Sequence, residues 1–152
     1  MKIKIAFADL TYTNQGISSN SFPFGAALVA SYAKKKLGDK IDFELFKYPD
    51  DFKNFLENQN PKIVCFTNYS WTFDISHEFS QRIKKKFPET IIIFGGPNYP
   101  NEVYTQTKFL TSYPAIDFYI KGEGEISFVE LFNNLEKFNF NANSLKKNKI
   151  KS

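Results

Sequence analysis

The sequence predicts an α/β fold in which parallel strands form one sheet with helices on both faces. Short apolar, β-branched runs alternate along the chain with longer segments that have helical spacing. Most of the apolar runs are nearly continuous, which is typical of strands covered on both faces. Parallel strands need crossover helices, and right-handed crossovers in one sheet give a doubly wound arrangement. We therefore expect a Rossmann-like (flavodoxin-like) five-stranded parallel sheet in the order 2-1-3-4-5.

The expected elements follow in chain order from these patterns. The predicted strands are Ile3–Ala8, Ile41–Phe46, Ile63–Thr67, Thr90–Phe94 and Ile116–Ile120. Apolar stripes with helical spacing lie between them. They predict helices over Leu28–Leu37, ended by Gly38, over Ile75–Phe87, ended by Pro88, and over Phe128–Phe138. Weaker patterns predict helices around Asp51–Asn58 and Asn101–Leu110.

The 152 residues are enough for one domain with its own core. We assign residues 1–138 to this domain. From residue 139 onward Asn and Lys dominate, so residues 139–152 are interpreted as a tail, or as a linker to a domain outside this chain.

Composition excludes several classes of protein. The net charge of +4 comes largely from lysines near the C-terminus and at helix ends, so we expect no nucleic acid partner. No apolar run approaches the roughly 20 residues of a membrane-spanning helix, so no membrane association is expected. A single cysteine excludes a disulfide framework within the chain and favours a cytoplasmic location.

Irregular, glycine-rich or polar segments follow the predicted strands and should meet at one edge of the sheet. They are residues 10–22, 67–72, 95–98 and 122–125. Each has an ordinary structural explanation: glycines make tight turns, Glu123 and Glu125 favour a helix N-terminus, and Trp71 can be a partly buried aromatic residue. Together they indicate an edge suited to a large, mostly uncharged ligand.

Other ligand classes fit this edge less well. The phosphate-binding motifs Gly-x-x-x-x-Gly-Lys and, after the first strand, Gly-x-Gly-x-x-Gly are missing from the sequence. Thr11 and Thr13 supply only part of a flavin phosphate loop. A phosphorelay receiver needs an acceptor aspartate at the end of the third strand, where this chain has Thr67 and Asn68.

We assign no catalytic residue and no metal ligand. His77 is the only histidine and falls within a predicted helix, while Cys65 falls within a predicted strand and is expected to be a buried, small apolar residue. We pair neither of them into a nucleophile–base arrangement.

The segments at this edge resemble the cobalamin-binding domain at the N-terminus of cobalamin-dependent radical SAM enzymes. The matching stretches are Pro23–Leu28 with Ala30–Tyr32, Tyr69–Trp71, Ile93–Pro97 and Asp117–Glu125, followed by Phe128 and Glu130-Leu131. The resemblance covers roughly residues 1 to 138.

The resemblance implies that cobalamin lies across the carboxyl edge of the sheet. It places Tyr69, Ser70 and Trp71 near the lower face of the corrin. It places the nucleotide tail along Gly95, Gly96 and Pro97 and along Gly122, Glu123 and Gly124. It further implies that Thr11, Tyr12 and Asn14 pack on the corrin or its amide side chains.

One difference from related families concerns the lower cobalt ligand. Methionine synthase and the mutases carry Asp-x-His-x-x-Gly after the first strand, and the histidine binds cobalt. Here Asp9 is followed by Leu10-Thr11-Tyr12, and His77 lacks the motif's spacing and glycine. We therefore expect cobalamin bound base-off with no histidine as lower ligand.

A second difference limits what this chain does alone. Radical SAM enzymes need a Cys-x-x-x-Cys-x-x-Cys segment for their cluster, and one cysteine cannot supply it. S-adenosylmethionine and the 4Fe–4S cluster are thus expected only in a radical SAM barrel domain outside this chain, whose chemistry would be methyl transfer or a related reaction. The alternative left open is a flavodoxin-like interaction or scaffold domain with no cofactor.

Overall fold

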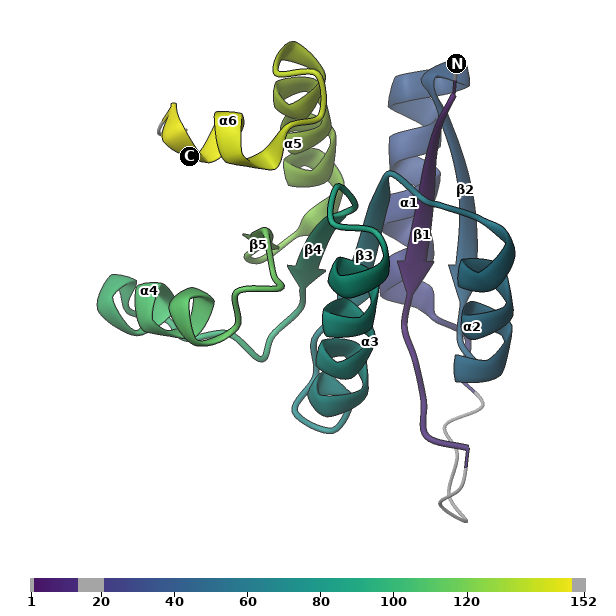
Figure 1. The fold of residues 1–152 in the computed structure, drawn as a ribbon, viewed down its shortest axis with the longest axis horizontal. Coiled ribbons are helices and arrows are strands. Elements are labelled where there is room, and N and C mark those ends of the chain that lie inside the picture. The colour runs from purple at the N-terminus through teal and green to yellow at the C-terminus, as the bar shows by residue number, and fades with distance from the viewer. Residues whose placement is uncertain (1, 14–20, 149–152) are drawn as a thin grey trace.

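The computed structural model describes residues 2–13 and 21–148. It contains a parallel sheet of five strands in the order β2-β1-β3-β4-β5, as the sequence predicts (Figure 1). The strands are β1 (Ile3–Ala8), β2 (Ile41–Phe46), β3 (Ile63–Thr67), β4 (Ile91–Gly95) and β5 (Phe118–Ile120).

Helices cover both faces of the sheet. They are α1 (Phe24–Leu37), α2 (Pro49–Asn58), α3 (Phe73–Lys86), α4 (Val103–Ser112), α5 (Gly124–Lys137) and α6 (Ala142–Lys147), with a short 3₁₀ turn over Gly38–Lys40. The helices α1 and α5 pack with Ile5, Phe7 and Ile93 on one face. On the other face, α2 and α3 pack with Phe66 and Phe94. The inner strands β1, β3 and β4 therefore have apolar side chains on both faces, which explains their apolar runs, whereas the edge strand β2 alternates with exposed Asp42 and Glu44.

Two strands begin later than predicted. Thr90 precedes β4 because its backbone N–H donates to the Phe87 carbonyl in a turn (3.0 Å). Ile116 precedes β5 because its N–H donates to the Tyr113 carbonyl at the end of α4 (3.0 Å). Such differences of one or two residues are usual at element ends.

The sequence did not predict helix α6. The side chain of Asn141 caps it by accepting from the Ser144 N–H (2.9 Å), and Leu145 is 1% exposed within the core on the α1–α5 side. Lys146 pairs with Asp117 (2.9 Å), which also pairs with Lys84. Residues 142–147 thus pack on the domain, and a connection from this region to a further domain stays a prediction. None of the helices in the described parts of the chain could span a membrane by length and apolarity.

Candidate functional site

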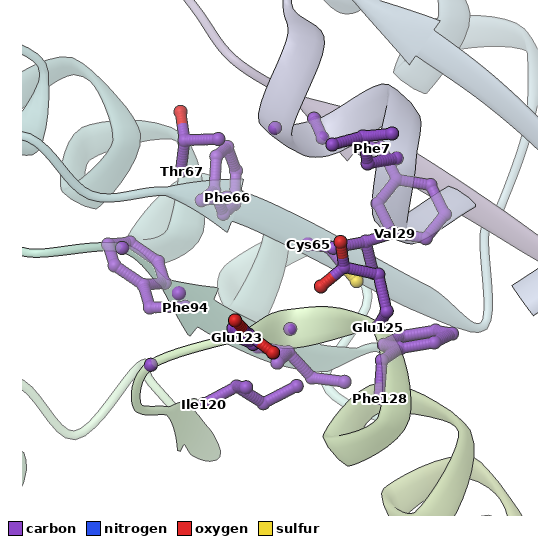
Figure 2. A pocket seen from close by; sticks show the side chains of 18 of the residues that line it. Phe7, Val29, Cys65, Phe66, Thr67, Phe94, Ile120, Glu123, Glu125 and Phe128 are labelled. Atoms are coloured by element: carbon purple, nitrogen blue, oxygen red, sulfur yellow. The ribbon is translucent and has the colours of Figure 1, made fainter. Parts of the chain in front are cut away.

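A pocket of about 260 Å³ opens at the carboxyl edge of the sheet (Figure 2). It lies between the ends of β3, β4 and β5 and the first turns of α1 and α5. We call it the glycine pocket. Its lining consists of Phe7, Gly25, Ala26, Leu28, Val29, Cys65, Phe66, Thr67, Tyr69, Ile93, Phe94, Gly95, Gly96, Ile120, Gly122, Glu123, Gly124, Glu125 and Phe128.

The lining of the glycine pocket is mostly apolar. Aromatic and aliphatic side chains from the sheet and from α1 and α5 make up its walls. Its described lining includes no lysine or arginine, while Glu123 and Glu125 contribute carboxylates. Among the described residues, neither carboxylate has a hydrogen bond or ion pair. The pocket therefore suits an uncharged ligand group better than a phosphate.

The turn after β4 brings the backbone very close to the end of β3. Gly96 has φ +126°, a conformation that L side chains rarely adopt, and a Cβ there would lie 2.8 Å from the Asn68 carbonyl oxygen. The Asn68 N–H donates to the Gly95 carbonyl (2.7 Å). Glycine at position 96 is thus required for this close approach, beyond its use in a tight turn.

A hydrogen-bond network holds this turn in place. The Asn68 side chain is fully buried and donates to the Asn98 carbonyl (2.7 Å) and to the Tyr119 hydroxyl (3.1 Å). The Tyr119 hydroxyl donates in turn to the Gly96 carbonyl (2.9 Å), and Tyr99 stacks on the Tyr119 ring with centroids 3.8 Å apart. Burial raises the pKa of Tyr119 to about 12. Sequence reasoning missed this network because only the structure shows which polar side chains meet.

The turn before α5 depends on glycine in the same way. Gly122 has φ +77°, and a Cβ on Gly124 would lie 2.8 Å from Cγ2 of Val29. Gly124 therefore lets the first turn of α5 approach α1, which narrows the glycine pocket between the two helices.

A second hollow of about 490 Å³ adjoins the glycine pocket, and we call it the aromatic hollow. It is lined by Asp9, Leu10, Thr11, Ser21, Phe22, Phe24, Gly25, Ala26, Lys47, Thr67, Tyr69, Trp71 and Thr72. Four of these residues also line the glycine pocket: Gly25, Ala26, Thr67 and Tyr69. The two openings therefore adjoin each other along the carboxyl edge of the sheet.

Two stacked rings form one side of the aromatic hollow. The Tyr69 and Trp71 rings are nearly parallel, with centroids 4.9 Å apart and an interplanar angle of 10°. Trp71 is 69% exposed, although an aromatic ring of that size is usually well covered. Phe22 and Phe24 are also exposed at this hollow, at 67% and 66%. The hollow thus offers an apolar, flat surface to a ligand.

An ion pair lies at the base of the aromatic hollow. Asp9, after β1, accepts a hydrogen bond from the Thr67 hydroxyl (2.6 Å) and pairs with Lys47, after β2 (3.2 Å). Both charged side chains are about 15% exposed. These contacts join the ends of β1, β2 and β3 and leave the base of the hollow close to neutral.

The structure brings most of the predicted binding residues together. Tyr69, Gly95, Gly96, Gly122, Glu123 and Gly124 line the glycine pocket. Thr11, Tyr69 and Trp71 line the aromatic hollow. Tyr12, Ser70 and Pro97 line neither opening, and Asn14 lies outside the described residues.

The histidine and the cysteine have different environments. The His77 ring is stacked on Phe73 and lies edge-on to Tyr113, with centroids 5.6 and 4.9 Å away, and it lines neither opening. Cys65 is only partly buried, which corrects the expectation of full burial, because its side chain borders the glycine pocket. Burial nonetheless raises the pKa of its thiol, which therefore stays protonated at neutral pH.

Comparison with solved structures shows the fold. A "novel cobalamin-binding protein" from Desulfitobacterium hafniense superposes with a TM-score of 0.59 at 14% identity, over 86% of this chain and 57% of that one. The activated DrrB receiver domain superposes with a TM-score of 0.56 at 20% identity, over 90% and 99%. These identities are low, so both likenesses concern the fold alone.

Curated proteins match part of the chain. The cobalamin-dependent radical SAM methyltransferase TokK from Streptomyces tokunonensis is 28% identical over 71 residues. The 2-(S-pantetheinyl)-carbapenam-3-carboxylate methyltransferase from Streptantibioticus cattleyicolor is 28% identical over 72 residues. Each alignment covers 47% of this chain but only 10% of the relative.

The model of one protein family covers most of the chain. It is described as the B12 binding domain, and it matches residues 16–132. This range contains all of β2 to β5 and the glycine pocket apart from Phe7. The chain therefore belongs to the B12 binding domain family.

Proposed function

We propose that this domain holds cobalamin base-off, without a histidine as lower ligand, as the cofactor-binding part of a cytoplasmic radical SAM enzyme of the methyltransferase type. Cobalamin binding itself is the function that the family indicates. The proposal adds three points to cobalamin binding: the base-off state, the absence of a histidine ligand, and the radical SAM partner.

The observation that carries the proposal is that the two openings adjoin and share lining residues. Cobalamin combines a broad, flat corrin with a nucleotide tail, so its site needs a wide apolar surface joined to a narrower pocket. The aromatic hollow and the glycine pocket have these shapes and share Thr67 and Tyr69. A Cβ at Gly96 or Gly124 would lie 2.8 Å from Asn68 or Val29, so glycine at these positions lets the chain pack closely around the pocket. The apolar lining of the openings fits the flat corrin and the uncharged base of the tail.

Each set of residues has a role in this proposal. Tyr69 and Trp71 offer a flat surface to the corrin, and Thr11 contributes at the base of the aromatic hollow. The nucleotide tail would lie along five residues of the glycine pocket: Gly95, Gly96, Gly122, Glu123 and Gly124. Four predicted contacts are not among the residues that line these two openings: Tyr12, Asn14, Ser70 and Pro97. When bound, cobalamin supplies a cobalt centre that can carry a methyl group.

The position of His77 supports the missing histidine ligand. Its ring packs against Phe73 and Tyr113, and it lines neither opening. The protonated thiol of Cys65 is also a poor metal ligand, since thiolates are the ligating form. The proposed corrin surface is formed instead by the aromatic rings of Tyr69 and Trp71.

The radical SAM partner is inferred from the relatives. Both are methyltransferases, one of them named as a cobalamin-dependent radical SAM enzyme, and the aligned region is a tenth of their length. A single cysteine cannot hold a 4Fe–4S cluster. S-adenosylmethionine and the cluster would therefore be bound by another domain, and this chain would hold the cofactor and exclude water from one of its faces.

Titration calorimetry with hydroxocobalamin tests the proposal against the scaffold alternative. We expect saturable binding of one cobalamin per chain, and the same binding by His77→Ala. A scaffold domain would give no saturable heat. Loss of binding in a folded His77→Ala variant would contradict the missing histidine ligand.

A further inference from the structure

A further hollow, of about 500 Å³, lies at the amino edge of the sheet, opposite the glycine pocket and the aromatic hollow. It lies between the starts of β1, β3 and β4 and the C-terminal end of α3, near the N-terminus of the chain (Figure 1). We call it the lysine hollow. Its lining consists of Lys2, Ile3, Lys4, Asn60, Pro61, Lys62, Lys86, Phe87, Pro88, Glu89 and Thr90.

The lining of the lysine hollow is strongly positive. It contains four lysines and a single carboxylate, that of Glu89. The helix dipole favours lysines in the last turn of a helix, which explains Lys86 at the end of α3. The other three lysines lie at the starts of two strands, at Lys2 and Lys4 for β1 and at Lys62 for β3. A helix end therefore does not account for most of this charge.

Most of these charges are not neutralised within the described parts of the chain. The ammonium groups of Lys4 and Lys86 donate to uncharged oxygens, a side-chain amide 2.5 Å away and a backbone carbonyl 3.2 Å away. The Lys62 ammonium has no hydrogen bond or ion pair among the described residues. Lys2 pairs with Asp39 at 3.5 Å, but the Asp39 side chain is 94% exposed, so this pair contributes little. The hollow thus has positive charge available for an anionic partner.

Apolar side chains accompany the lysines. Ile3, Pro61, Phe87 and Pro88 belong to the same lining. The Lys86 ammonium lies 4.9 Å from the centre of the half-buried Phe87 ring. An occupant that combines carboxylates with an apolar side chain would therefore match both parts of the surface.

The backbone of the lysine hollow favours carboxylates over phosphates. Phosphate sites typically use free backbone N–H groups at a helix N-terminus. Here α3 ends at the hollow and presents the negative end of its dipole. The Lys62 N–H donates to the Lys4 carbonyl, and the Ile91 N–H donates to the Lys62 carbonyl, both at 2.9 Å. Neither N–H is free for a phosphate, whereas separate carboxylates along a peptide can each pair with one lysine.

The acidic occupant comes from outside this chain. Residues 14–20 and 149–152, which lie outside the described parts, contain no aspartate or glutamate. Glu123 and Glu125 line the glycine pocket at the opposite edge of the sheet. The five residues of β3 alone separate the two edges by roughly 17 Å, at about 3.3 Å per residue. These carboxylates therefore do not reach the lysines of their own chain.

We propose that the lysine hollow docks an acidic peptide segment of a partner protein. Carboxylates of that segment pair with Lys4, Lys62 and Lys86, and one of its apolar side chains packs on Phe87 and Pro88. Because the hollow and the cobalamin openings lie at opposite edges of the sheet, the partner binds without covering the cofactor site. This inference goes beyond the proposed function and does not depend on it.

Fluorescence anisotropy with an acidic probe tests the inference. The probe is a short fluorescein-labelled peptide of glutamates with two phenylalanines at its centre. The wild type should bind it saturably, and added salt should weaken the binding. Lys62→Glu should weaken it by about tenfold, because like charges then face each other, and Glu89→Gln should strengthen it. The matched control is Lys108→Glu, which changes the net charge equally at an exposed residue of α4 outside the hollow, and it should bind as the wild type does.

Four results would overturn the inference. The first is the absence of saturable binding by the wild type. The second is an equal loss in Lys62→Glu and Lys108→Glu, which would indicate a response to net charge alone. The third is tighter binding of tripolyphosphate or of a single-stranded oligonucleotide than of the peptide, and the fourth is displacement of the probe by hydroxocobalamin.

A second variant covers the case in which Lys62→Glu does not fold, as judged by circular dichroism. Lys86→Glu then applies the same test, because Lys86 is exposed and lines the same hollow. Failure of the proposed function is distinguishable from failure of this inference. A wild type that binds no hydroxocobalamin should still bind the peptide.

Discussion

A Cβ atom at Gly96 would lie 2.8 Å from the carbonyl oxygen of Asn68, and 3.1 Å from its nitrogen. Both neighbours are backbone atoms, which cannot move away without opening the turn after β4 or the end of β3. Only glycine at position 96 therefore permits the close approach of these two segments beside the glycine pocket.

Gly96→Ala should therefore destabilise the domain. A side chain at φ +126° is strained, and the contact with Asn68 adds to the cost, so we expect a loss of about 2–4 kcal/mol in the free energy of unfolding. Urea denaturation measures it. Gly25→Ala is the matched control, because a Cβ there meets nothing within 4 Å, and its stability should stay within about 1 kcal/mol of the wild type. Equal stability of the two variants would contradict the role of Gly96.

Trp71→Ala should weaken hydroxocobalamin binding without unfolding the chain. The side chain is 69% exposed, so little buried surface is lost, but its stacking on Tyr69 and its flat apolar face disappear. We expect an affinity loss on the order of tenfold, measured by titration calorimetry. Tyr104 is similarly exposed, at 77%, and lines neither opening, so Tyr104→Ala should bind as the wild type does. The same loss in both variants would argue against a corrin surface at Trp71.

Tyr119 should make stability depend on pH in the alkaline range. Burial raises its pKa from the ordinary value of 10 to about 12, so between these values the folded chain keeps a proton that the unfolded chain releases. Its contribution is fully present below pH 10 and decreases as the pH rises toward 12. Between pH 8 and pH 11, the urea midpoint of the wild type should fall more than that of Tyr119→Phe. An identical fall would show that Tyr119 ionises freely in the folded chain.

Leu145→Ala should destabilise the domain by about 2–4 kcal/mol if α6 belongs to the folded unit. Leu145 is 1% exposed in the core formed with α1 and α5. Thermal unfolding followed by circular dichroism measures the loss. Lys147→Ala alters an exposed residue of the same helix and serves as the control. Unchanged stability of Leu145→Ala would mean that α6 does not contribute to the fold in solution.

The sheet could be predicted from the sequence because its strands are covered on both faces. Continuous apolar runs such as residues 63–66 have no polar positions that suggest a solvent-exposed face, and their alternation with helical patterns leaves few topologies. Helix α6 could not be predicted in this way. It is short and mostly polar, and it packs on the domain through Leu145 and Ala142 and through the ion pair between Lys146 and Asp117.

The site was predictable only in part. Glycines and Trp71 are easily recognised in the sequence. Because they follow the predicted strands, they indicated a site at the carboxyl edge of the sheet. Three other residues of the site are the fully buried Asn68, Tyr119 with its hydroxyl, and the partly exposed Cys65. Their roles depend on contacts between segments far apart in the sequence, and neither composition nor motif spacing predicts such contacts. Ser70 and Pro97 share loops with pocket residues but do not line the openings, because neighbouring positions in a loop point in different directions.

The central claim is that the two joined openings hold one cobalamin without a histidine ligand. The most direct measurement is the absorption spectrum of the chain after mixing with hydroxocobalamin and gel filtration. The account predicts that one corrinoid per chain elutes with the protein and shows a base-off spectrum that His77→Ala leaves unchanged. A corrinoid that elutes only with small molecules would contradict it, as would a wild-type spectrum of nitrogen-ligated cobalt that changes to the base-off form in His77→Ala.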